Sequence, residues 1–202
     1  NYDYIQKKSK SFLIDKFHNW RRKQRWNRQY KSGRWKNLRG DKERGRYKTI
    51  IDFINKHGNG EPSVLDLGCG EGILCERMKN EAYSKFVGMD FSSESIKQAN
   101  EKELDKAVFK VADLHYFKPE QKYDVIVFNE AFYYVHDSEK ANVLQIMMNA
   151  LTENGIIINS IYREGAGSWE YFKIEALQQI DFKTVTTSEA KTYWKIGVYK
   201  KS

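Results

Sequence analysis

The part of the chain that most constrains its fold is the stretch 64–72, which reads VLDLGCGEG. Its apolar start predicts a buried strand, which runs into a turn with glycine at every second position and then into a helix. Glycine permits positive φ and lets a ligand lie against bare backbone. A turn of this kind, at the carboxyl end of a parallel strand, is where open α/β sheets bind their ligands.

Beyond this turn, short apolar runs alternate with helical patterns, which predicts a doubly wound α/β sheet whose first five strands are parallel. The tail holds two Thr-, Val- and Tyr-rich runs with no helix between them, so we expect an antiparallel hairpin at the sheet edge. The predicted strands are Ser63–Leu67, Lys85–Asp90, Ala107–Val111, Asp124–Asn129, Gly155–Ile161, Phe182–Ser188 and Tyr193–Lys200, and the predicted helices cover about residues 72–80, 93–104, 138–150 and 168–178.

The first quarter of the chain differs in charge from the rest. Residues 1–50 hold 17 basic and 4 acidic side chains, whereas the other 152 residues hold 18 and 23. A helical pattern covers residues 4–30, and a second helix is predicted from an Asp41 N-cap to a Gly58 C-cap. We therefore expect a basic, aromatic-rich helical arm or lid in residues 1–40 and an α/β domain in residues 41–202.

Length and composition exclude several classes of protein. The 202 residues suffice for one domain, and a hydrophobic content of 40% excludes general disorder. No apolar run approaches the ~18 residues that a membrane-spanning helix requires. Cys69 and Cys75 match neither a disulfide framework nor a metal motif, so we expect no metal site and a reducing, cytoplasmic location.

Three acidic residues, Asp66, Asp90 and Asp113, lie at the carboxyl ends of successive predicted strands, which meet at one edge of the sheet. Asp66 suits a positively charged ligand, such as an ammonium or a sulfonium, better than a pyrophosphate. Asp90 follows the glycines by about 20 residues, where a ribose diol is expected. Asp113 is placed to accept a hydrogen bond from an adenine amino group. The D-x-G-x-G-x-G spacing also differs from the G-x-G-x-x-G of dinucleotide sites.

With these motifs the chain resembles the class I S-adenosylmethionine-dependent methyltransferases over about residues 45–200. Residues 64–72 are similar to the family's first motif, and residues 124–130 (DVIVFNE) resemble the strand-four motif beside the methyl group. The resemblance implies a seven-stranded sheet with an antiparallel last strand, with S-adenosylmethionine as cofactor and S-adenosylhomocysteine as product. The cofactor-binding residues that it implies are Asp66, Gly68, Cys69, Gly70, Gly72, Asp90, Phe91, Asp113, Leu114 and Asn129.

A finer likeness concerns the methyl acceptor. The Glu43-x-x-Arg46-Tyr47 motif and the stretch 129–134 (NEAFYY) are similar to nodulation N-methyltransferases that act on chitin oligosaccharides. They also resemble small methyltransferases that modify bacterial surface glycans, including capsule phosphoramidate groups. This likeness implies an oxygen or nitrogen acceptor on an anionic small molecule, sugar or surface-glycan precursor, and thus a role in polysaccharide modification or capsule biosynthesis.

The acceptor decides whether the enzyme needs a base. A hydroxyl must lose its proton to a group within hydrogen-bond reach, whereas a neutral amine or a phosphate oxygen needs no strong base. Glu130 and His136 are the candidate bases, although Glu130 also fits an orienting acceptor and His136 a helix N-terminal residue. Tyr134 joins them as a candidate catalytic residue, and Tyr133 as a substrate-binding one; both could instead pack the following helix.

The arm interleaves cations with aromatic rings, and three interpretations stay open. It is a lid over an anionic small molecule or glycan, a structural cover, or a nucleic-acid grip of an RNA methyltransferase. The candidate substrate-binding residues are Tyr30, Arg34, Trp35 and Arg46. Base methylation is disfavoured, since residues 129–132 (NEAF) are not the Asn/Asp-Pro-Pro-aromatic tetrad. A cofactor-binding module without turnover is the remaining alternative, and the sequence does not indicate an oligomeric state.

Overall fold

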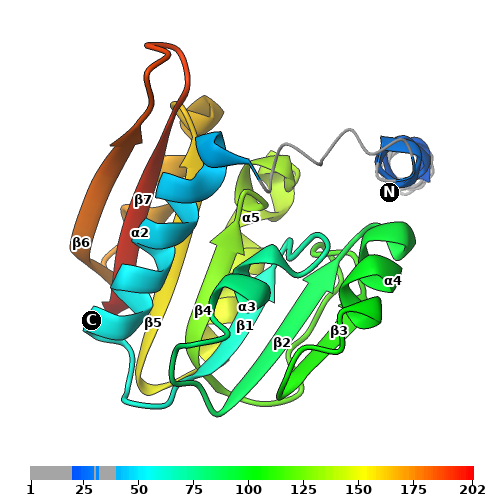
Figure 1. The fold of residues 1–202 in the computed structure, drawn as a ribbon. Helices are drawn as coiled ribbons and strands as arrows, with labels where there is room; N and C mark the ends of the chain where they lie inside the picture. The colour runs from blue at the N-terminus through cyan, green and yellow to red at the C-terminus, as the bar shows by residue number, and fades with distance from the viewer. Residues whose placement is uncertain (1–19, 30, 32–39) are drawn as a thin grey trace, which may run out of the picture.

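The computed structural model describes residues 20–29, 31 and 40–202 (Figure 1). Of the helix predicted over residues 4–30, residues 20–29 are described and are helical, and we call this segment the 20–29 helix. Residues 1–19, 30 and 32–39 lie outside the described residues. Among the described helices, none has the length and apolarity to cross a membrane.

One seven-stranded sheet forms the centre of the molecule, in the order β3-β2-β1-β4-β5-β7-β6. β7 runs antiparallel to both of its neighbours, while β1 to β5 are parallel, which confirms the predicted doubly wound sheet and its edge hairpin. The strands are β1 (Ser63–Leu67), β2 (Lys85–Asp90), β3 (Ala107–Val111), β4 (Tyr123–Asn129), β5 (Leu151–Tyr162), β6 (Leu177–Thr186) and β7 (Tyr193–Lys201), and the helices are α2 (Asp41–His57), α3 (Ile73–Arg77), α4 (Ser93–Glu101), η2 (Phe132–Tyr134), α5 (Asp137–Asn149) and η3 (Gly165–Phe172).

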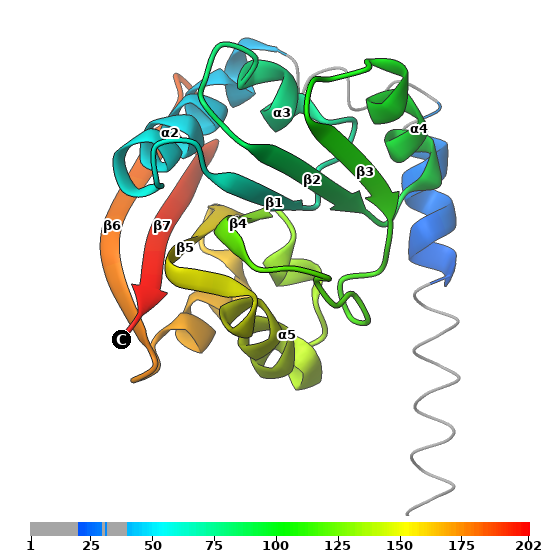
Figure 2. The ribbon, with the colours of Figure 1, turned by 90° about the horizontal axis from the view of Figure 1, so that it is seen from below.

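Helices cover both faces of the sheet. α2, α3 and α4 lie on one face and α5 with η3 on the other (Figures 1 and 2). Because successive strand residues point to opposite faces, each inner strand contributes to both cores. In β1, Val64 packs into the core under α2 and α3, whereas Leu65 and Leu67 pack into the core under α5. Asp66 therefore shares the face of α2.

Several predicted element bounds are wrong. The helix expected over residues 168–178 is instead the short 3-10 element η3, interrupted at Ala166 and Gly167, which have φ of +49° and +81°. Strand β6 already begins at Leu177, because its pairing along β7 overrides the local helical pattern. α3 covers only Ile73–Arg77, and β5 begins four residues earlier than predicted. The N-cap of α2 is Gly40, and its C-cap is Gly58 as predicted.

Candidate active site

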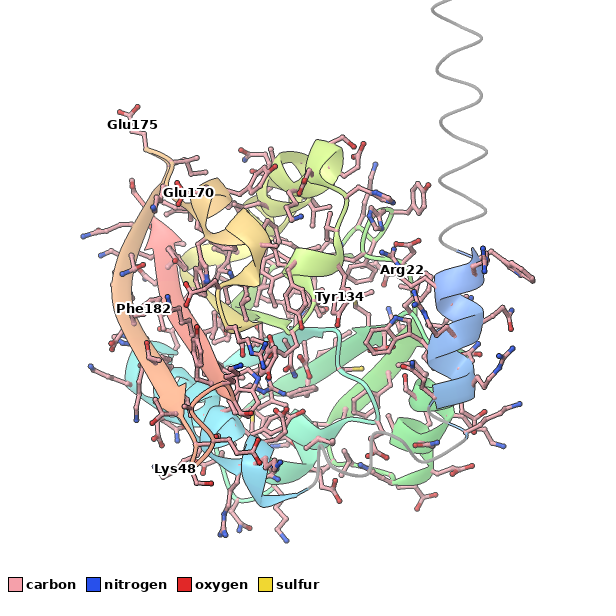
Figure 3. The ribbon with its side chains drawn as sticks, turned by 90° about the horizontal axis from the view of Figure 1, so that it is seen from above. Arg22, Lys48, Tyr134, Glu170, Glu175 and Phe182 are labelled. Carbon is pink, nitrogen blue, oxygen red and sulfur yellow. The ribbon has the colours of Figure 1, made fainter. Side chains whose placement is uncertain are left out.

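A cavity of about 570 Å³ lies at the carboxyl edge of the sheet. Its walls are the residues that follow β1, β2, β3 and β4, together with parts of α2, β5, β7 and the 20–29 helix. Figure 3 looks down on this edge, and Arg22 and Tyr134, which both line the cavity, are labelled close together there. Of the three predicted strand-end acids, Asp90 and Asp113 therefore line this cavity, whereas Asp66 does not.

The glycine turn forms the floor of this cavity. Gly68 and Gly70 line it with φ of +83° and +55°, and the N–H groups of Gly68 and Cys69 both donate to the Met89 carbonyl oxygen (2.9 and 3.0 Å). A Cβ on Gly68 would lie 2.9 Å from both the Asn129 carbonyl oxygen and the Ala131 Cβ, so only glycine fits there.

Gly72, a predicted cofactor residue, does not line the cavity. It is the N-cap of α3 with φ of +80°, and a Cβ there would meet the Phe109 ring at 3.1 Å. Its requirement for glycine thus comes from the turn and from packing between α3 and β3.

Asp90 closes β2 beside the glycine turn. Its Oδ2 accepts a hydrogen bond from the Gly70 N–H (3.0 Å), and its Oδ1 accepts from the Ser92 N–H (2.9 Å) and the Ser95 hydroxyl (3.2 Å). Burial raises the pKa of this carboxyl, and these hydrogen bonds oppose the shift. Phe91 follows it on the cavity wall. The carboxyl is held in one orientation at the mouth of the turn.

Asp113 lies on the same wall with Leu114. Its Oδ1 accepts from both the backbone N–H (3.0 Å) and the ring Nδ1 (2.7 Å) of His115. The His115 Nε2 in turn accepts from the His136 N–H (3.1 Å), so this ring is the Nδ1–H tautomer. Burial raises the pKa of Asp113, but hydrogen bonds from His115 outweigh it and hold the pKa below its ordinary value.

Asp66 lies behind the wall rather than on it. It is fully buried, its Oδ1 accepts from the Asn129 Nδ2 (3.1 Å), and its Oδ2 has no partner among the described residues. Asn129, which lines the cavity, accepts at Oδ1 from the Arg46 Nη1 (2.6 Å), and the Arg46 Nε donates to Glu43 (2.6 Å). This chain of bonds ties α2 to the ends of β1 and β4.

Glu130 follows β4 directly and takes a left-handed φ of +54°, which residues with a side chain rarely adopt. It lines the cavity, and its Oε2 is buried without a hydrogen-bond partner among the described residues. Burial raises the pKa of this carboxyl to about 8; the Arg46 guanidinium opposes the shift, and Glu43 adds to it. The side chain can therefore take up or release a proton near neutral pH.

Aromatic rings wall the cavity around Glu130. Tyr162 and Trp194 are register partners on β5 and β7, with ring centroids 5.7 Å apart, and Tyr133 reaches the cavity from η2. Glu43 completes this side from α2. We call the part of the cavity lined by Glu43, Glu130, Tyr133, Tyr162 and Trp194 the aromatic chamber.

The 20–29 helix covers the opposite side. The Arg22 Nη1 donates to the Tyr134 carbonyl oxygen (2.9 Å), and the Trp26 ring meets the Tyr134 ring edge-on, with centroids 5.5 Å apart. The Ser92 hydroxyl donates to the Asn27 Oδ1 (2.7 Å). The helix therefore bridges the turn after β2 and the η2 segment across the cavity.

The structure does not bring all predicted residues to the cavity. His136 is the N-cap of α5 and is absent from the cavity lining, so it is not placed as a base. Tyr30, Arg34 and Trp35 lie outside the described residues. Lining residues that the sequence analysis missed include Arg22, Trp26, Glu43, His115, Tyr162 and Trp194. Glu43 could have been predicted from the Glu43-x-x-Arg46-Tyr47 motif. Arg22 and Trp26 could have been predicted from the basic, aromatic pattern of the arm.

Comparison with known proteins decides the family. A family model described as a methyltransferase domain matches residues 59–195. The chain belongs to the class I S-adenosylmethionine-dependent methyltransferases. This methyltransferase is 27% identical over 171 residues to a ubiquinone biosynthesis O-methyltransferase of Yersinia enterocolitica, covering 80% of the chain and 69% of that protein. It is 28% identical over 123 residues to malonyl-[acyl-carrier protein] O-methyltransferase 2 of Ilyobacter polytropus, covering 59% of the chain but only 45% of that relative.

Solved structures support the fold of the methyltransferase. It is similar to magnesium protoporphyrin IX methyltransferase from Synechocystis with bound cofactor (TM-score 0.74, 17% identity, 91% of this chain and 97% of that one). It is also similar to the N-methyltransferase NodS from Bradyrhizobium japonicum in complex with S-adenosylhomocysteine (TM-score 0.69, 17% identity, 83% and 91%). At these identities the likeness concerns the fold alone.

The methyltransferase uses S-adenosylmethionine, and the cavity fits that cofactor. Gly68 and Gly70 offer bare backbone for its methionyl part, the fixed Asp90 carboxyl suits the ribose diol, and Asp113 suits the adenine amino group. The Asp66 carboxyl lies behind Asn129, so any help that it gives to the cofactor ammonium passes through that side chain.

Proposed function

We propose that this methyltransferase methylates an oxygen or nitrogen of a small molecule whose reactive end enters the aromatic chamber. The observation that carries the proposal is the Glu130 carboxyl, which lines the cavity beside the glycine turn with one oxygen unpartnered among the described residues. The curated relatives include O-methyltransferases and the solved ones an N-methyltransferase, so family membership alone does not select the acceptor atom.

When bound, S-adenosylmethionine supplies a methyl group that is already strongly electrophilic on its sulfonium. The protein's task is then to place the acceptor in line, to exclude water and to remove a proton where necessary. Tyr133, Tyr162 and Trp194 exclude water, and the Glu130 carboxylate takes the acceptor's proton. The strained backbone of Glu130 fixes where that carboxylate lies.

The sequence also predicts an anionic, sugar-derived acceptor. That prediction depends on Tyr30, Arg34 and Trp35, which lie outside the described residues, and on Arg46, whose guanidinium already binds Glu43 and Asn129. The RNA alternative gains no support from the chamber, since two carboxylates wall it. A gel shift with RNA that weakens steeply with salt would revive that alternative.

The direct test is turnover of Glu130→Gln, with acceptors found by screening small-molecule fractions with labelled cofactor. We expect the kcat to fall about 10²–10⁴-fold while S-adenosylhomocysteine binds with unchanged affinity, because only the proton acceptor is lost. Glu153→Gln makes the same change at an exposed position and should leave the kcat unchanged.

The pH profile gives a second readout of the same group. We expect the wild-type kcat to rise with pH through about 8, since Glu130 must be ionised to accept a proton. The ionisable groups facing it are Glu43 and Arg46 on α2 and Tyr133 on η2. Full activity of Glu130→Gln, or a flat wild-type profile, would show that Glu130 is not the proton acceptor.

A further inference from the structure

The aromatic chamber combines carboxyl groups with aromatic rings. Glu43 and Glu130 contribute carboxyl groups from α2 and from the end of β4, and Tyr133, Tyr162 and Trp194 contribute rings. Aromatic faces attract cations through their quadrupoles, and a carboxylate with an unpartnered oxygen needs a donor. Both features are complementary to a positively charged group.

Cations near the chamber are already engaged with other groups. Within the described part of the chain, three Lys and Arg residues line the cavity. Arg46 is buried and binds Glu43 and Asn129, the Lys42 Nζ binds Glu189 (2.6 Å), and Arg22 binds the Tyr134 carbonyl on the other side of the cavity. Arg163, whose guanidinium lies 4.7 Å from the Tyr162 ring centroid, donates from Nε to the Lys191 carbonyl oxygen (2.6 Å). As far as the described residues show, a carboxylate or phosphate in the chamber would therefore face Glu130 and a Glu43 that is already paired with Arg46.

We propose that the methyl acceptor is an amine, which enters the aromatic chamber as an ammonium ion between Glu130 and the rings of Tyr133, Tyr162 and Trp194. This inference rests on the proposed function and narrows its acceptor class. The rest of the substrate extends from the chamber toward solvent, and it is the reacting group that carries the positive charge.

The chemical step balances without a further reactant. Glu130 as a carboxylate takes one proton from the ammonium, which leaves a neutral amine with a free lone pair. That lone pair forms the new N–C bond to the methyl carbon while the C–S bond breaks and its electron pair stays on sulfur. The product is a methylated ammonium and a neutral thioether, and Glu130 returns its proton to solvent when the product leaves.

A hydroxyl fits this arrangement less well. A hydroxyl brings no charge for the rings and the carboxylate to recognise, and a carboxylate is far too weak a base to deprotonate an alcohol before attack. An ammonium has a pKa of about 10.4, as in lysine, much closer to that of Glu130. Recognition and proton transfer therefore favour the same class of acceptor.

Three probes with the same ring and different head groups test the inference: cyclohexylamine, cyclohexanol and cyclohexanecarboxylate. The full chain, loaded with S-adenosylhomocysteine, is titrated at pH 9, and the shift of the Trp194 indole N–H signal is followed by NMR. At that pH Glu130 is ionised and the amine is still protonated. We expect the ammonium to bind about five- to tenfold more tightly than the alcohol, and the carboxylate to bind most weakly.

Glu130→Gln should abolish the preference for the ammonium and leave the alcohol's affinity unchanged, and Glu153→Gln should keep the preference. Binding of S-adenosylhomocysteine by each variant checks that the variant is folded. If the wild type binds the alcohol as tightly as the ammonium, or if Glu130→Gln keeps the preference, the amine assignment is wrong and the proposed function stands. If the wild type fails to bind S-adenosylhomocysteine, both the amine assignment and the proposed function are wrong.

Discussion

At the scale of single residues, burial sets the ionisation of Asp66 and links it to stability. Burial raises the pKa of this carboxyl to about 7; the hydrogen bond from Asn129 and the charge of Arg46 oppose the shift, and Asp90 adds to it. In an unfolded chain an aspartate has a pKa of about 3.9. The folded state therefore holds a proton that the unfolded state releases, and stability falls as the pH rises from about 4 to 7.

Asp66→Asn should remove this dependence while keeping the shape of the side chain. We expect the variant to gain stability over the wild type as the pH rises, by up to about 1.4 kcal/mol per pH unit in that window, and to differ little at pH 4. Urea unfolding at pH 4, 5.5 and 8 measures the difference. Asp52→Asn, at an exposed residue paired with Lys48, is the control. An equal difference at every pH would show that Asp66 does not titrate in this range.

Single residues also show where sequence reasoning succeeds. Gly68, Gly70 and Asp90 were predicted to share a site because their signal is local: each lies at the end of a strand, and the parallel topology brings those ends together. Tyr162 and Trp194 were missed because no local pattern marks them. They meet only because β7 inserts antiparallel beside β5, which is a tertiary event.

At the scale of elements, the 20–29 helix is the part whose role the sequence left most open. Its described side chains hold both sides of the cavity, through Asn27 to Ser92 and Arg22 to Tyr134. A helix with that placement closes the cavity over Phe91 and Asp113 rather than presenting all its charge to solvent. We expect it to contribute directly to cofactor affinity.

Arg22→Met and Asn27→Ala test that role. Each substitution removes one hydrogen bond that holds the helix over the cavity and contributes about 1 kcal/mol. Each should therefore weaken S-adenosylhomocysteine binding about fivefold in calorimetry. Arg28→Met, on the exposed side of the same helix, should leave the affinity unchanged. If both Arg22→Met and Asn27→Ala bind S-adenosylhomocysteine with unchanged affinity, the helix only covers the sheet.

The wrongly predicted helix over residues 168–178 shows the limit of local patterns. The segment has apolar residues at helical spacing, but it continues a 3-10 element that is kinked at Ala166 and Gly167 and ends at Phe172. Residues from Leu177 onward pair with β7 through a ladder of backbone hydrogen bonds, which an isolated segment could not form. Long-range pairing thus decided an element that its own sequence leaves ambiguous.

At the scale of the whole molecule, the sheet brings distant segments to one cavity. The residues after four strands, parts of α2, β5 and β7, and the 20–29 helix share its walls. The unfolded chain has no such arrangement, so a ligand bound there stabilises only the folded state. The size of that effect reports on the site as a unit rather than on any one residue.

Saturation with S-adenosylhomocysteine should therefore raise the melting temperature of the full chain. At 100 times the Kd, linkage predicts about 2.7 kcal/mol, which for a chain of this size is a rise of about 5–10 °C. Amide exchange should slow in the turns after β1 and β2 and in the 20–29 helix, but not at the β6 edge. Asp90→Asn, compared with its own ligand-free form, should show a smaller rise, since the ribose-facing carboxylate is lost. A melting temperature that does not move with ligand, or protection confined to the β6 edge, would place the cofactor elsewhere, because every segment named here converges on the cavity at the carboxyl edge.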